Sequence, residues 1–171
     1  MTGTGDAAAP GPDTAARPAP ERHVFHGLGD LAGSVGIRLG PTGWRTVTQD
    51  DVTAFGRITG DEQWIHTDVE RARRGPFGQT IAHGFLTLAL CSWVLDELQT
   101  TTGVSYAINY GLDRVRFPAT VPAGARVGGT VRLDTVTDRG GDVDAAWVVE
   151  ITVEGAARPS CVATMLSRYR P

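Results

Sequence analysis

Apolar side chains surround nearly the whole circumference of one predicted helix, at residues 82–98. Charged residues appear only at its exit, where Asp96 and Glu97 follow the last apolar turn. A helix without a polar face must be enclosed by protein on most sides. We therefore expect this segment to form the centre of the fold. Its apolar residues are Phe85, Leu86, Leu88, Ala89, Leu90, Trp93, Val94, Leu95 and Leu98.

Downstream of Gly103 the hydrophobic pattern changes from helical to alternating. Apolar side chains alternate with polar or smaller ones in residues 143–153 and again in 161–169, which is typical of half-buried antiparallel strands. Two further strands are expected at 105–117 and 126–136, with Gly- and Pro-containing turns between the strands. An all-round apolar helix and a sheet with one apolar face predict an α+β domain in which the sheet curls around the helix.

A shorter helix is predicted upstream, at residues 49–58. Thr48 and Asp51 have the spacing of a capping box, and apolar residues recur at three-residue intervals after them. Gly60 lies where a helix end needs a residue that tolerates positive φ. The chain should turn there and deliver Asp61 just beyond the helix.

Composition separates the start of the chain from the rest. Residues 1–22 are rich in Gly, Ala, Pro and Thr and carry no large apolar side chain after Met1, so we predict a disordered tail followed by a single domain, residues 23–171. Cys91 and Cys161 lie in apolar contexts and are expected to be reduced core thiols.

The charge balance excludes two classes of partner. The chain has 16 basic and 19 acidic residues, a net charge of −3 and no run of Lys or Arg, so we expect it to bind neither nucleic acid nor an anionic membrane surface. No apolar segment is long enough to span a bilayer and no export signal is recognisable, so we expect a cytoplasmic protein.

The first candidates for chemistry are Asp61 and His66. Their spacing of five positions places them on different faces of a helix or strand, so they converge only if the chain bends between them. A carboxylate and an imidazole that meet on one water can activate it and move a proton, as hydration and dehydration require. From spacing alone, an aspartate that caps a helix and a packed histidine are the simpler interpretation.

The second candidate segment is Ala82-His83-Gly84-Phe85, at the start of the apolar helix. The first amides of a helix lack internal partners and lie at the positive end of its dipole, so they can stabilise a developing oxyanion. Gly84 presents no side chain to obstruct a ligand. Alternatively, Gly84 allows close packing at the helix entry and His83 is a capping or core histidine.

Together these segments closely resemble the MaoC-like dehydratases, also called (R)-specific enoyl-CoA hydratases or hydratase-2, and among them the single-domain group related to nodulation protein NodN. The resemblance covers about residues 30–169 and includes the turn at 75–78 and the segment 109–118. It implies a hot-dog fold and a homodimer whose sheets join edge to edge with each site near the interface. We expect no cofactor, and we expect no metal site because His23 and His26 have no evident third ligand.

The resemblance also assigns roles to residues. Asp61 and His66 match the catalytic pair, and Gly84 matches the position whose backbone amide binds the thioester oxygen. The implied reaction interconverts trans-2-enoyl and (R)-3-hydroxyacyl thioesters of coenzyme A or an acyl carrier protein. Where the family motif reads Gly-Asp-x-Asn-Pro-x-His, this chain has Gln in place of Asn and Trp in place of Pro. Further contacts with the substrate are expected from Gln63, Trp64, His83 and Phe85.

Two other functions remain open from the sequence. A hot-dog thioesterase would use the same fold, and a non-catalytic subunit could bind acyl thioesters without turning them over. The pairing of Asp61 with His66 ahead of Ala-His-Gly favours hydration over both. Three arginines between the motifs, Arg71, Arg73 and Arg74, could meet the phosphates of the substrate, although a solvated polar face is the simpler interpretation.

Overall fold

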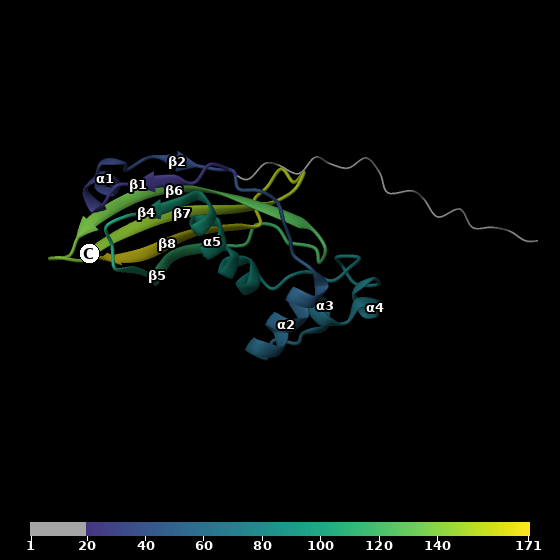
Figure 1. Ribbon diagram of the computed structural model, residues 1–171. Helices are drawn as coiled ribbons and strands as arrows, with labels where there is room; N and C mark the ends of the chain where they lie inside the picture. The colour runs from purple at the N-terminus through teal and green to yellow at the C-terminus, as the bar shows by residue number, and fades with distance from the viewer. Residues whose placement is uncertain (1–19) are drawn as a thin grey trace, which may run out of the picture.

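A curved antiparallel sheet wraps around one long helix, α5 (Gly84–Leu98), in the computed structural model, which describes residues 20–171 (Figure 1). The strand order is β2-β6-β7-β8-β5, and β3 pairs with β6 beside β2. This confirms the α+β hot-dog architecture that the hydrophobic pattern and the family resemblance predicted. The strands of this sheet are β2 (Arg38–Leu39), β3 (Arg45–Thr46), β5 (Tyr106–Arg116), β6 (Arg126–Asp138), β7 (Val143–Val153) and β8 (Cys161–Arg170).

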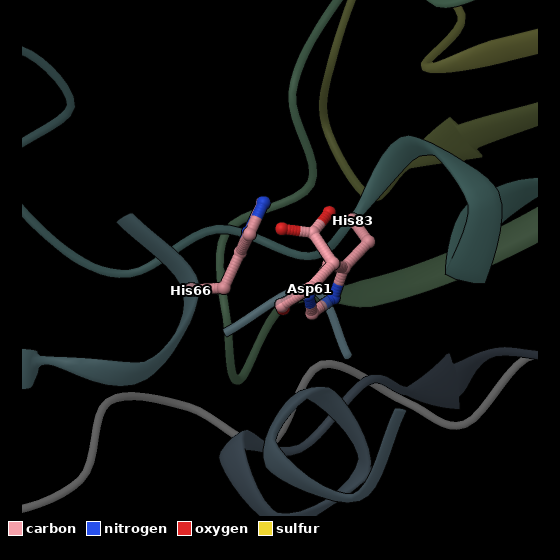
Figure 2. Close-up of side chains that lie close together, drawn as sticks. All are labelled: Asp61, His66 and His83. Carbon is pink, nitrogen blue, oxygen red and sulfur yellow. Dashed lines mark hydrogen bonds between the residues drawn. The ribbon is translucent and has the colours of Figure 1, made fainter. Parts of the chain in front are cut away.

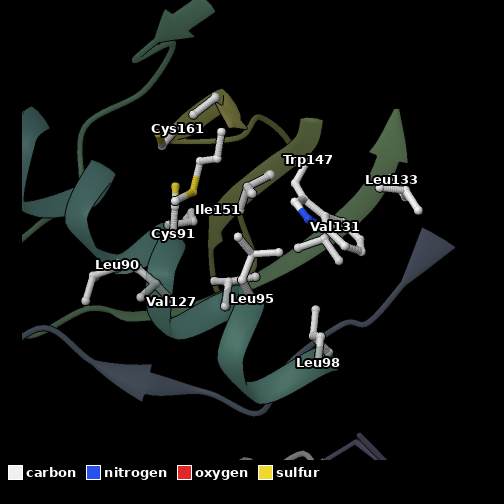
Figure 3. Packing of buried hydrophobic residues seen from close by; sticks show 14 of the residues in the cluster. Leu90, Cys91, Leu95, Leu98, Val127, Val131, Leu133, Trp147, Ile151 and Cys161 are labelled. Carbon is white, nitrogen blue, oxygen red and sulfur yellow. The ribbon is translucent and has the colours of Figure 1, made fainter. Parts of the chain in front are cut away.

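The core lies between α5 and the concave face of the sheet (Figure 3). Leu95 and Leu98 of α5 and Trp147 of β7 are buried, and the Trp147 indole Nε1 lies 3.3 Å from the Tyr169 hydroxyl. Along β8, buried and half-buried residues alternate, as the sequence predicted. Cys91 and Cys161 are both buried and free, which confirms the prediction of core thiols.

One glycine sets how closely the sheet approaches the helix. A Cβ atom on Gly129 of β6 would lie 2.6 Å from a methyl group of Val94 and 2.9 Å from the Glu150 carbonyl oxygen. Any side chain at this position would therefore separate β6 from α5.

Short elements before residue 49 escaped the sequence analysis. Strand β1 (His23–Phe25) pairs in parallel with β4 (Gln99–Thr101), and helix α1 (Leu28–Gly33) follows it. These elements are too short for a hydrophobic period to reveal them. Of the predicted disordered tail, the first 19 residues lie outside the described residues.

Three helices lie together beyond the N-terminal end of α5: α2 (Gln49–Thr59), α3 (Trp64–Thr67) and α4 (Val69–Ala72) (Figure 1). Helix α2 begins with the predicted capping box and ends at Gly60, whose φ is 77°. Within residues 20–171, no helix is long and apolar enough to cross a membrane.

The start of α5 differs from the prediction. The helix begins at Gly84 rather than at residue 82. The Ala82 amide donates to the Val121 carbonyl at 2.7 Å, and Ile81 forms a bridge with Pro122, so this backbone is extended rather than helical. This extended segment leads directly into the first turn of α5.

Candidate active site

Asp61 and His66 converge because the chain bends sharply between α2 and α3. Gly60 adopts the left-handed conformation that ends α2, and α3 begins only three residues beyond Asp61. The Asp61 carboxylate, a nitrogen of His66 and a nitrogen of His83 all lie within 4.8 Å of one another. In Figure 2 the carboxylate of Asp61 extends toward the outer ring nitrogen of His66. The carboxylate is exposed, whereas both imidazoles are buried.

A backbone carbonyl holds the ring of His66. Its Nδ1 lies 2.7 Å from the carbonyl oxygen of Ile81. Because a carbonyl oxygen can only accept a hydrogen bond, Nδ1 carries the proton and Nε2 has a free lone pair. His66 is therefore arranged to accept a proton on the side that faces Asp61.

Half-buried Gln49 and buried Thr80 fix the backbone of His66 as well. Gln49, the first residue of α2, donates from Nε2 to the His66 carbonyl at 2.8 Å. The Thr80 hydroxyl donates to Oε1 of the same Gln49 at 2.5 Å. Neither residue is predicted from the sequence, because their contacts join segments 31 and 17 positions apart and no local pattern reveals them.

The N-terminus of α5 lies beside the pair. His83 is the N-cap residue, and no side chain of the described residues caps the helix. The amides of its first turn thus remain available to a ligand. A Cβ on Gly84 would lie 3.1 Å from the Phe117 ring, so this glycine also permits close packing at the helix entry. Binding of the thioester oxygen by the Gly84 amide remains a prediction that is compatible with this packing.

The other predicted substrate contacts occupy different environments. Gln63 is exposed at the start of α3, and Phe85 is 70% exposed on α5. Trp64 is half-buried. Gly75 leaves room for the Trp64 ring, because a Cβ on residue 75 would lie 2.9 Å from that ring. His83 is only 2% exposed. Of the four side chains, Gln63 and Phe85 are therefore the most accessible to a ligand.

Two of the three arginines between the motifs have local partners. The Arg71 guanidinium lies over the Trp64 ring, 4.4 Å from its centroid, and Arg73 forms an ion pair with Glu70 at 2.7 Å. These contacts agree with a polar surface that braces α3 against α4. A role in phosphate binding for these arginines remains a prediction.

The cluster of Asp61, His66 and His83 has the residue types of a metal site, but its geometry suits one poorly. The two imidazole rings are stacked, with centroids 3.8 Å apart and planes inclined by 27°. Imidazole binds metal through a lone pair in the plane of its ring, so lone pairs of stacked rings run side by side and do not meet at one ion. In each ring, moreover, one nitrogen already lies against a carbonyl oxygen.

Two pockets along α5 could receive an acyl chain. One of about 300 Å³ lies between α5 and β5 and is lined by Leu88, Ala89, Ser92, Asn109, Gly111, Leu112 and Met165. Another of about 180 Å³ lies between α2 and α5, with Phe55, Ile58 and Leu86 among its lining residues. Both are mainly apolar, as an acyl chain requires.

The curved sheet and the central helix define a hot-dog protein, and a carboxylate and two imidazoles meet at the start of that helix. Residues 31–154 match the family described as MaoC like domain. The chain therefore belongs to the MaoC-like family.

Individual relatives agree with this assignment. The chain is 51% identical to "3-hydroxyacyl-thioester dehydratase Z" of Mycobacterium tuberculosis (strain ATCC 25618 / H37Rv), over 85% of this chain and 97% of the relative. It is 38% identical to "Nodulation protein N" of Rhizobium leguminosarum bv. viciae, over 82% and 89%. The solved structure of the (R)-hydratase from A. caviae superposes with a TM-score of 0.63 at 20% identity, over 80% of this chain and 96% of that chain, and this likeness shows the fold.

Proposed function

We propose that this chain interconverts trans-2-enoyl thioesters and (R)-3-hydroxyacyl thioesters by adding or removing water. The observation that carries the proposal is the convergence of Asp61 and His66 beside the uncapped N-terminus of α5. Its relative at 51% identity, named a 3-hydroxyacyl-thioester dehydratase, supports the same reaction class.

In the hydration direction, Asp61 and His66 hold one water against C3 of the substrate. As the water oxygen bonds to C3, electrons of the C2–C3 double bond move toward the thioester oxygen, where the first amides of α5 stabilise the negative charge. Nε2 of His66 or the Asp61 carboxylate accepts the proton that leaves the water. The same pair then delivers a proton to C2 from the same side, so the addition is syn, the pair regains its starting protonation state, and dehydration follows this path in reverse.

The acyl chain lies, on this proposal, in the apolar pocket between α5 and β5, and the thioester lies at Gly84. Coenzyme A and the pantetheine arm of an acyl carrier protein both present such a thioester, and the chain is expected to accept either. The reaction needs no cofactor, because it takes water from solvent and the site itself supplies the base and the oxyanion donors. We place the enzyme in the cytoplasm, where its two free cysteines would stay reduced.

We further propose a homodimer formed along β5. This strand ends the sheet, so one of its edges is unpaired within residues 20–171. An unpaired strand edge with apolar side chains is a template for another strand. Exposed large apolar residues gather on β5 and next to it: Phe85, Tyr106, Ile108, Tyr110, Leu112 and Phe117. Because Phe117 packs against Gly84, a partner at this edge would lie close to the site.

Light scattering after size-exclusion chromatography tests the dimer. Wild type is expected to run at twice the mass of one chain, and Ile108→Glu at the mass of one chain, because the charge would be buried between the strands. Val35→Glu, at a residue 50% exposed elsewhere on the surface, is the matched control and should remain dimeric. A wild type that is monomeric at micromolar concentration would contradict the proposal.

A crotonyl-CoA assay separates the candidate functions. Hydration consumes the enoyl absorbance and yields 3-hydroxybutyryl-CoA of R configuration. Free CoA without any hydroxyacyl product would instead establish a thioesterase. A binding subunit would hold acyl-CoA while wild type, Asp61→Asn and His66→Ala all hydrate at the same background rate.

A further inference from the structure

His83 connects the loop that carries Asp61 to the N-terminus of α5. Its imidazole Nε2 lies 2.8 Å from the backbone carbonyl oxygen of Asp61, and its own backbone leads directly into the Gly84 amide at the start of α5. One residue thus joins the loop that presents the acid–base pair to the helix end that faces the thioester. Figure 2 shows the His83 ring below the Asp61 carboxylate.

The surroundings of His83 fix which nitrogen carries its proton. The Asp61 carbonyl can only accept a hydrogen bond, so Nε2 is the donor. Nδ1 is buried and has no partner within the described residues. Nε2 therefore carries a proton, and Nδ1 takes no part in the hydrogen bond to Asp61.

Packing locks the ring of His83 in place. It stacks on His66 on α3 and contacts the Phe55 ring of α2 at a centroid distance of 5.2 Å. It is 2% exposed, so a substrate has little surface to touch. These contacts suit a residue that orients others better than one that binds substrate.

Gly56 of α2 lies next to the hydrogen bond between His83 and the Asp61 carbonyl. A Cβ on this buried glycine would lie 3.0 Å from the Asp61 carbonyl oxygen and 3.6 Å from two atoms of the His83 ring. A side chain at residue 56 would press on the Asp61 carbonyl oxygen that accepts this hydrogen bond.

We propose that His83 is a positioning residue, which holds the Asp61 carbonyl through Nε2 and so sets the acid–base pair at a fixed place relative to the Gly84 amide. The expected effects on kcat rest on the proposed hydration reaction. The positioning role replaces the substrate contact expected for His83 from the sequence with a contact to the enzyme's own backbone.

A pair of isosteric substitutions tests the role of Nε2. The amide nitrogen of Gln can occupy the position of Nε2, whereas that of Asn reaches only the position of Nδ1. His83→Asn is expected to lower kcat ~10- to 100-fold with little change in KM, because the pair is displaced while binding is kept. His83→Gln should recover most of the lost kcat. Exposed His26 supplies the matched controls His26→Asn and His26→Gln, which should match wild type.

Gly56→Ala tests the same hydrogen bond without changing His83. It should lower kcat as His83→Asn does, and the double variant should be little worse than either single one, because both break one contact. A raised KM with unchanged kcat in His83→Asn would overturn the proposal in favour of substrate binding. Equal losses in His83→Asn and His83→Gln, or an unchanged kcat in Gly56→Ala, would also overturn it.

Imidazole ¹⁵N spectra of the full chain test the proposal even if no hydration is found. His83 is expected to carry a proton on Nε2, and His66 to carry one on Nδ1. Backbone amides of residues 61–63 should exchange faster with solvent in His83→Asn than in His83→Gln. A His83 without a proton on Nε2 would overturn the proposal, whereas an inactive wild type with the expected spectrum would contradict the proposed function alone.

Discussion

The Nδ1 atom of His66 lies 2.7 Å from the carbonyl oxygen of Ile81, so backbone just upstream of α5 orients the imidazole that α3 carries. This single hydrogen bond decides that Nε2, and not Nδ1, is free to accept a proton. It also places the histidine by means of a segment that leads into Gly84, the start of the helix that would bind the thioester.

The substitution His66→Asn separates orientation from proton transfer. The Asn amide can still donate to the Ile81 carbonyl from about the position of Nδ1, but it has no acceptor at the position of Nε2. We expect the fold to be kept and kcat for crotonyl-CoA hydration to fall by ~100-fold or more. Steady-state kinetics with a thermal unfolding curve measures both. A kcat within twofold of wild type would show that His66 takes no proton.

Thr80→Val is expected to damage stability and rate together. The change removes the hydroxyl that donates to Oε1 of half-buried Gln49, and the loss of such a hydrogen bond costs about 0.5–1.5 kcal/mol in the free energy of unfolding. Because Gln49 holds the His66 carbonyl, kcat should fall as well. Urea unfolding and kinetics of the variant measure the two effects. Thr120→Val, at an exposed threonine, is the control and should change neither quantity.

Gly129→Ala should destabilise the whole domain. Its new methyl group would overlap the Val94 side chain, and overpacking of a core costs about 1–3 kcal/mol in the free energy of unfolding. Gly29→Ala is the matched control, because it lies in helix α1 with no atom within 4 Å of the added Cβ. Urea unfolding should show a lower midpoint for Gly129→Ala only. Equal midpoints for the two variants would mean that β6 can move away from α5 without cost.

Stability should depend on pH through Asp144. Its carboxylate accepts hydrogen bonds from Arg168 at 2.6 and 2.8 Å, and those hydrogen bonds, together with one from Arg139, lower the pKa of Asp144 to about 2 from its usual 3.8. A depressed pKa stabilises the fold above the unfolded value and loses that contribution as pH falls toward the folded one. We therefore expect Asp144→Asn to lower Tm at pH 7.

The difference in Tm between wild type and Asp144→Asn should then shrink as the pH falls from about 4 toward 2, the window between the two pKa values. Differential scanning calorimetry over this range measures it. A difference that stays constant down to pH 2 would show that the ion pairs of Asp144 do not stabilise the fold.

The elements that the sequence predicted are those with local signals. Thr48 and Asp51 are three residues apart and form the capping box that begins α2, and Gly60 ends that helix at positive φ. The apolar helix and strands β7 and β8 follow from periodicity, since each is long enough to show its period. Strands β5 and β6 follow from the turns on either side of them. By contrast, β1 and β4 have three residues each and exist through pairing across the chain.

The same distinction applies to the site. Asp61, His66 and Gly84 were found by motif and family resemblance, yet their spacing could not show that they converge. What brings them together are contacts between distant segments, from His66 to Ile81 and from His83 to Asp61. Gln49 illustrates the limit most clearly: in the sequence it is an ordinary first residue of a helix, and only the fold directs its amide to the His66 carbonyl.

The most direct test of the central claim is the rate of crotonyl-CoA hydration by Asp61→Asn against that by Glu62→Gln. Both variants replace an exposed carboxylate with its isosteric amide, in adjacent residues of one loop. We predict that Asp61→Asn loses ~100-fold or more in kcat, because general acid–base catalysis is lost, and that Glu62→Gln keeps the wild-type rate. Equal rates for the two variants would contradict the assignment of Asp61 and His66 as the pair that activates water.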